Sequence, residues 1–108
     1  MKLVNLTPHP VRLIRADGSE LVIPPSGTVP RLREVVEDTG MRIDGIPVVR
    51  KGFGEIENLP EPQEGVFYIV SALVAQAARD RDDLLIPDDL VRDEEGRIIG
   101  ARRLALPG

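Results

Sequence analysis

The chain has 108 residues, 42% of them hydrophobic, with a net charge of -4, no Cys and a single His. That length fits one domain with a modest core, and the composition excludes disulfides, thiolate metal sites, iron–sulfur clusters and, within one chain, any metal site with two histidines. The 10 Gly and 10 Pro predict many turns and short strands. The negative net charge argues against nonspecific binding to a nucleic-acid backbone.

The first half of the chain has the pattern of successive β-hairpins. Asp17-Gly18 and Asp44-Gly45 are strong hairpin-turn signals, and Pro47 favours an edge strand because it cannot donate to a neighbouring strand. In chain order, we expect strands over 3–6, 11–15, 20–23, 29–36, 41–43 and 46–49.

The second half begins after a proline-containing connector at about 59–65. The continuous apolar run 66–70 predicts a strand buried on both faces. Ser71 has the position of an N-cap, and the residues that follow predict a helix at about 71–80. We then expect a short strand at 84–87, stopped by Pro87, and a last hairpin in which strands over 90–92 and 97–104 flank a turn at 93–96.

These elements predict a single α+β domain spanning 1–108. Mostly antiparallel strands, in a small barrel-like or sandwich sheet, would surround one buried helix. Apart from Gln76, the segment 72–78 is apolar on every side, which indicates a helix that is buried all round. Either strands wrap it, or a second copy of the chain covers its outer face. We favour a homodimer formed through 72–79.

Candidate ligand contacts lie at the strand-to-helix corner and among the arginines. A helix N-terminus at Ser71 presents free backbone N–H groups, and arginine side chains form bidentate contacts with phosphates and carboxylates. The alternatives are that Ser71 only caps the helix and that the arginines only pair with neighbouring carboxylates. The predicted anion-binding residues are Ser71, Arg81, Arg92 and Arg102, with Thr7 and His9 at the rim.

Catalysis and metal binding receive less support. His9 stands between two prolines, which restrict it to an extended conformation, and it is the one residue suited to general base chemistry. Thr7 and His9 are equally explained by backbone hydrogen bonds at a tight corner. The acidic loop 80–89 lacks the spacing of a calcium-binding EF-hand, so solvated loop charge explains it better than a metal site.

Three segments together resemble a family of short, largely uncharacterised proteins of bacteria and tailed phages that open with an N-L-T-P-H motif. They are Asn5–His9, Tyr68–Ser71 and Val91–Gly100, and the likeness extends over nearly the whole chain. The resemblance implies no catalytic residue. Some phage-borne proteins of this size are sponges that sequester nucleotide immune signals, as in anti-Thoeris systems, and by analogy this chain would bind such a signal.

The sequence thus favours a non-enzymatic, homo-oligomeric protein that binds a small anion such as a nucleotide, without a cofactor. The alternative is a structural or assembly module of a phage or bacterial complex that has no small-molecule ligand. Neither a signal peptide nor an apolar run of about 20 residues is present, so we expect a cytoplasmic protein that does not bind membranes. We expect no nucleic-acid partner, because two of the three aromatics lie in the predicted buried strand.

Overall fold

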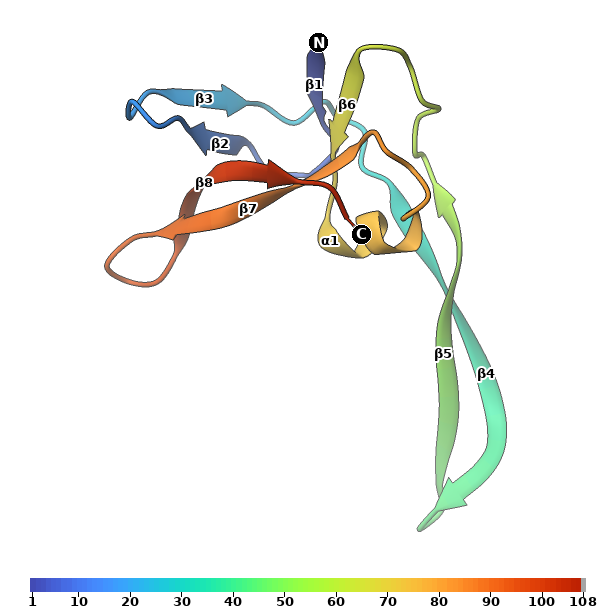
Figure 1. Ribbon diagram of the computed structural model, residues 1–108. Helices are drawn as coiled ribbons and strands as arrows, with labels where there is room; N and C mark the ends of the chain where they lie inside the picture. Colours follow the sequence, from blue (N-terminus) through green and yellow to red (C-terminus); the bar gives the residue numbers. More distant parts are fainter. Residues whose placement is uncertain (108) are drawn as a thin grey trace.

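The computed structural model describes residues 1–107 and consists mainly of β-strands (Figure 1). Its elements are β1 (Lys2–Asn5), β2 (Val11–Ile14), β3 (Glu20–Ile23), β4 (Arg31–Ile43), β5 (Ile46–Glu57), β6 (Val66–Ile69), α1 (Ala72–Ala77), β7 (Leu84–Arg92) and β8 (Ile98–Ala105). Six strands form one sheet in the order β1-β6-β7-β8-β2-β3, and β4 pairs only with β5. We call the six-stranded sheet with α1 the body, and residues 31–57 the arm.

The body sheet is mixed, which corrects the expectation of mostly antiparallel strands. The β2–β3 and β7–β8 pairs are the predicted antiparallel hairpins, whereas β1–β6, β6–β7 and β2–β8 pair in parallel. Turn residues identify only strands that are neighbours in sequence, because a parallel pair needs a long crossover. The arm and the connector after it provide such a crossover between the first three strands and β6.

The two edges of the body sheet approach each other, so that the sheet is nearly closed into a barrel-like form. At the end of β1, Asn5 forms an isolated bridge with Pro25, two residues after β3 ends. The Ser26 N–H donates a hydrogen bond to the Asn5 carbonyl at 2.9 Å. The loop after β3 therefore supplies the contact that nearly closes the sheet.

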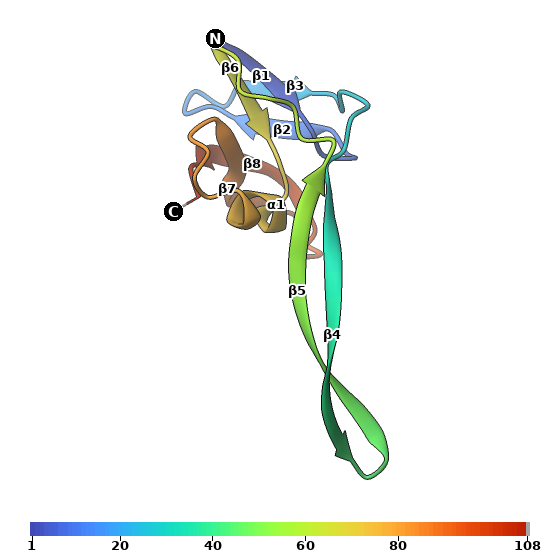
Figure 2. The same cartoon turned by 90° about the vertical axis from the view of Figure 1, so that its right-hand side faces the viewer.

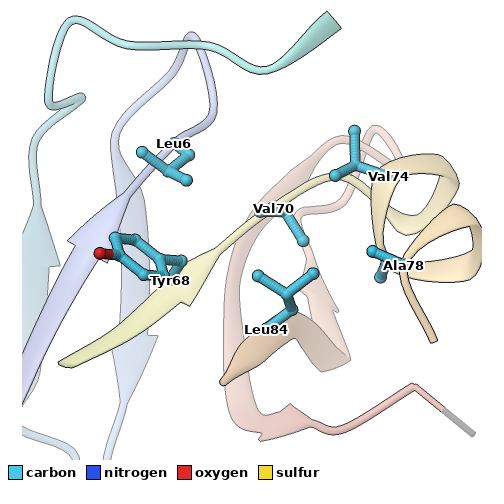
Figure 3. Packing of buried hydrophobic residues seen from close by; sticks show 7 residues of the cluster. Leu6, Tyr68, Val70, Val74, Ala78 and Leu84 are labelled. Carbon is cyan, nitrogen blue, oxygen red and sulfur yellow. The ribbon is translucent and has the colours of Figure 1, made fainter. Parts of the chain in front are cut away.

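The hydrophobic core lies between β6, the start of β7 and one face of α1 (Figure 3). Tyr68, Ile69 and Val70 are at most 3% exposed, whereas Val66 and Phe67 are half-buried, so the strand expected at 66–70 is present as β6 and is fully buried only toward its end. Val74 and Ala75 point from the helix into this core. The small alanine side chain lets the helix lie close to the sheet.

The helix is shorter and more exposed than predicted, so the chain is β-rich and not an α+β domain built around a large buried helix. It has six residues, ends at Ala77, and leaves Leu73 48% exposed. An apolar run without periodicity does not show how much of it is buried. The core here is large enough to cover only one face of α1.

Pro87 does not end the strand that contains it, contrary to expectation. β7 continues through Pro87 to Arg92, and Pro87 lies opposite Leu104 of β8. β6 pairs with β7 only at Leu84 and Leu85, so β7 has a single neighbour beyond that point. A proline is tolerated there because the missing N–H is not needed by a second neighbouring strand.

The arm is the most extended part of the molecule and projects away from the body (Figure 2). Its strands have 13 and 12 residues, so the short strands expected at 29–36, 41–43 and 46–49 are parts of one long hairpin. The predicted turn is confirmed: Asp44 and Gly45 have φ angles of 50° and 79°, the left-handed pair that tight hairpin turns require. Only the base of the arm contacts the body, where Ile56 packs against the core.

Candidate functional site

The loop after β1 is organised by Asn5, a residue that was not among the predicted site residues. Its side chain is 1% exposed and donates hydrogen bonds to the carbonyls of His9 at 2.8 Å and of Ile23 at 3.0 Å. Its carbonyl oxygen accepts hydrogen bonds from the backbone N–H and the hydroxyl of Thr7, at 2.9 and 2.6 Å. All the hydrogen-bonding capacity of this amide is therefore used to join β1, its loop and the end of β3.

Thr7 and His9, predicted at the rim of an anion site, belong to this network. The single proton of the Thr7 hydroxyl is shared between the Asn5 side-chain oxygen and the His9 carbonyl, which lies 2.9 Å from the hydroxyl oxygen. His9 contributes only its backbone carbonyl to this network, and the residue is exposed to solvent. The geometry corresponds to the tight-corner alternative. The N-x-T spacing is the local signal for it, because an asparagine oxygen readily accepts from the N–H two residues onward.

Ser71 caps α1, as the sequence predicts. Its hydroxyl oxygen accepts a hydrogen bond from the Val74 N–H at 3.3 Å. The hydroxyl thus satisfies one of the free donors of the first turn. With six residues, α1 has few aligned peptide dipoles to attract an anion at this end.

Arg81 forms the most enclosed ion pair of the described residues. Its Nε and Nη2 donate to the two carboxylate oxygens of Asp83 at 2.8 and 2.7 Å, and the two side chains are 17% and 9% exposed. The hydrogen bonds from Arg81 hold the pKa of Asp83 below its ordinary value of 3.8. The guanidinium is therefore engaged within its own turn.

Arg92 and Arg102 also have local partners. Arg92 Nη1 donates to the carbonyl of Gly96 at 2.9 Å across the β7–β8 turn, and Arg102 lies 3.6 Å from the Asp89 carboxylate. Within the described part of the chain, Thr7 and His9 are the only two of the six predicted residues that a hydrogen bond joins to each other. The structure therefore places these residues in separate local networks.

One arginine outside that set lines a hollow between α1 and the base of the arm. Arg79 contributes to this space of about 440 Å³ together with Phe53, Leu73 and Gln76. No hydrogen bond or ion pair of its side chain is present among the described residues. The hollow between the body and the arm therefore contains one guanidinium, that of Arg79, which has no partner among the described residues.

The acidic loop 80–89 does not assemble a metal centre in residues 1–107. No group of three or more His, Asp or Glu side chains there has an arrangement that could hold a metal ion. Asp83 and Asp88 instead accept hydrogen bonds from Arg81 and Arg103. These two carboxylates are therefore engaged in ion pairs with arginines.

The arm carries the largest set of unpartnered apolar side chains. Seven large apolar residues of β4 and β5 are between 44% and 66% exposed: Val35, Val36, Met41, Ile43, Ile46, Val49 and Phe53. Cross-strand register places Val36, Val49 and Phe53 on one face, and Val35, Met41, Ile43 and Ile46 on the other. Both faces of the ribbon therefore present hydrophobic surface to solvent.

Comparison with protein-family models, with curated proteins and with solved structures found no match. The resemblance to the N-L-T-P-H family therefore stays a prediction. Within the described residues, no helix has the length and apolar character needed to cross a membrane.

Proposed function

We propose that this protein is a structural module that assembles with copies of itself, and that the arm is its main assembly surface. The observation that carries the proposal is the apolar surface of the arm, which nothing within residues 1–107 covers. A patch of this kind on a soluble protein typically marks an interaction site. An isolated two-stranded ribbon is also marginally stable in water, so a partner would stabilise it.

The dimensions of the molecule support assembly. Its radius of gyration is 17.5 Å, compared with about 13 Å for a compact domain of this length. Its accessible surface is 7776 Å², compared with about 6,000 Å² for a compact monomer of 11.9 kDa. The excess is about twice the roughly 800 Å² that one partner buries in a standard protein interface.

The charge of the arm fits a second copy better than a strongly charged partner. Residues 31–57 contain five basic and six acidic side chains, and several pair within the arm, as in Lys51 with Glu34 at 2.7 Å and Arg42 with Asp38 at 3.2 Å. A nearly neutral surface does not repel an identical surface. The 27 residues of the arm also match the roughly 20–30 residues that each side of a stable interface contributes.

The predicted contact through 72–79 is compatible with this proposal but is a smaller feature. Leu73, the exposed large residue of α1, lines the same hollow as Phe53 of the arm. The exposed side of the helix and one face of the arm therefore form neighbouring surface. We include Leu73 as an extension of the arm interface.

The oligomeric mass of the purified protein tests the proposal. We expect light scattering after gel filtration to give a multiple of the monomer mass. Four substitutions, Val36→Thr, Ile43→Thr, Ile46→Thr and Val49→Thr, should reduce it to the monomer mass. Threonine keeps the β-branched shape that strands favour while it removes apolar surface, so the hairpin itself should persist.

The matched control is Leu106→Thr, which changes an apolar side chain on the body that is 61% exposed. It should leave the mass of the assembly unchanged. A wild-type protein that is monomeric at high concentration would contradict the proposal. So would an unchanged assembly in the fourfold variant, if circular dichroism shows that the variant is folded.

A second function, binding of a small anion such as a nucleotide, is favoured by one observation, the unpaired Arg79 in its hollow. The test is native mass spectrometry of the purified protein, followed by denaturation to weigh any released molecule. A stoichiometric anion that is retained by the wild type and lost in Arg79→Ala would support it. A protein free of small molecules that also fails to bind added adenosine nucleotides would contradict it.

A further inference from the structure

A second apolar surface lies on the body, in a groove between the β2–β3 and β7–β8 hairpins. The groove has a volume of about 320 Å³, and four large apolar side chains that line it are between 41% and 54% exposed: Val22, Leu90, Ile98 and Ile99. The buried residues Val11 and Ala101 also line it, yet neither belongs to the main core cluster. This part of the barrel-like sheet is therefore apolar but not filled.

The end of the arm is apolar like the groove. Ile43 and Ile46 form the last cross-strand pair before the turn, and Met41 lies on the same face. They are 58%, 66% and 54% exposed. We call these three residues the arm tip, a narrow apolar end on a ribbon only two strands wide.

The arm tip does not reach the groove of its own chain. The molecule extends 58 Å along its longest axis, and the arm points away from the body strands that form the groove (Figure 1). From the proposed self-assembly, on which this inference rests, we infer that the arm tip of one copy occupies the groove of another. Pairing of arms alone would cover the ribbon faces but leave the groove residues exposed.

The charged groups near both surfaces permit this contact. Arg12 is the charged residue that lines the groove, and it is paired with Glu20 at 2.7 Å. Near the arm tip, Arg42 is paired with Asp38 at 3.2 Å. Because Arg12 and Arg42 already have partners, the apolar surfaces can meet without leaving either guanidinium isolated in the interface, and the Asp44 carboxylate lies in the exposed turn beyond the arm tip.

Such an interface joins two different surfaces, so its geometry determines the size of the assembly. Two copies that exchange arms reciprocally form a closed dimer, whereas arms donated in one direction form a ring or a filament. In either arrangement each groove receives one arm tip. The stoichiometry of arm tip to groove is thus the same in all assemblies that this inference allows.

Cysteine cross-linking tests the contact directly, because the chain contains no Cys. Differently tagged Ile46→Cys and Ile98→Cys variants are co-expressed, purified as a mixed assembly and oxidised. We expect a disulfide between the two chains in more than half of the mixed assemblies. The control combines Ile46→Cys with Leu106→Cys, which places the second thiol outside the groove, and should give little cross-linked product.

Three results would overturn the inference. Cross-linking of Ile46→Cys only with itself would show that arm tips pair with each other, and the proposed self-assembly would still stand. A small molecule that occupies the groove, detected by native mass spectrometry and lost in Ile98→Thr, would identify another occupant. A wild type that is monomeric would contradict both the inference and the proposed function.

A second pair of variants checks the same contact without cysteine chemistry. Ile98→Thr with Ile99→Thr changes the groove, and Val36→Thr with Val49→Thr changes the middle of the arm. We expect the groove pair to weaken assembly at least tenfold, as measured by sedimentation, and the mid-arm pair to weaken it less. The reverse order would show that the arms pair along their length.

Discussion

The body and the arm differ in how much apolar surface each of them buries within its own chain. The body encloses a small core in which Ile69, Leu84 and Ala75 are fully buried, and it nearly closes its sheet through Asn5. The arm has no core of its own over most of its length and exposes apolar residues on both faces. The difference favours a body that folds from its own contacts and an arm that gains further contacts through the proposed self-assembly.

This contrast also separates two kinds of substitution. Changes to buried polar residues of the body should lower the free energy of unfolding of a single chain. Changes to the arm should alter association and leave the single chain almost as stable. The stability of a single chain should fall most when Asn5 is changed and least when Ile46 is changed.

Asn5→Ala should have the largest effect. It removes the Asn5 partner of the Ile23 carbonyl and of the Thr7 N–H, and one of the two donors to the His9 carbonyl; each buried group left unsatisfied costs about 1–3 kcal/mol. We expect a loss of about 4 kcal/mol in the free energy of unfolding, measured by urea denaturation of dilute protein. Gln63→Ala, which removes an exposed amide, should change it little; equal losses in both variants would contradict the role of Asn5.

Asp83→Asn should have the next largest effect, about 3 kcal/mol, because it leaves the enclosed Arg81 guanidinium without its charged partner. The effect should depend on pH. Because the pKa of Asp83 is lowered in the folded chain, its contribution is complete above the ordinary value of 3.8 and is lost as the pH falls through the lower folded value.

The measurement is urea denaturation of the wild type and of Asp83→Asn between pH 7 and pH 2. The difference between their free energies of unfolding should be constant near neutrality and should shrink in the acid range. A difference that grows as the pH falls would contradict the assignment. Asp82→Asn, which changes an exposed neighbour, is the matched control.

The sequence predicts the parts of this fold that are local. Both Asp-Gly turns, the last hairpin, the buried strand and the Ser71 cap can be read from residues close together in the chain, and the structure contains each of them. The parallel pairs and the near closure at Asn5 join segments far apart in sequence. No turn or periodicity reports on such contacts.

The candidate site was harder to predict for a related reason. Arg81, Arg92 and Arg102 belong to a residue type that binds anions, but their partners are side chains or carbonyls of nearby turns. The sequence predicts short strands at 29–36, 41–43 and 46–49, whereas β4 and β5 continue through interruptions such as Gly40 and Gly52. Ladder pairing across those interruptions depends on the partner strand, which local propensity does not describe.

Ser71→Ala should have a small effect on the body, about 1 kcal/mol, because one capping hydrogen bond at the start of α1 is lost. Ser71→Asp keeps an acceptor at the same place and should restore most of the loss. Urea denaturation of the three proteins measures both changes. If Ser71→Ala instead leaves stability unchanged and removes a bound anion, the capping interpretation is wrong and the ligand-binding one is favoured.

Ile46→Thr should have the smallest effect on a single chain and therefore tests the contrast between the two regions most directly. Ile46 is 66% exposed, so we expect a change within about 0.5 kcal/mol in dilute protein. When the chain is assembled, the stability of the wild type should rise with protein concentration, because association stabilises the folded state by mass action. Ile46→Thr should flatten that dependence. A variant that loses stability equally at all concentrations would show that the arm contributes to the folding of its own chain, and the division between body and arm would then be wrong.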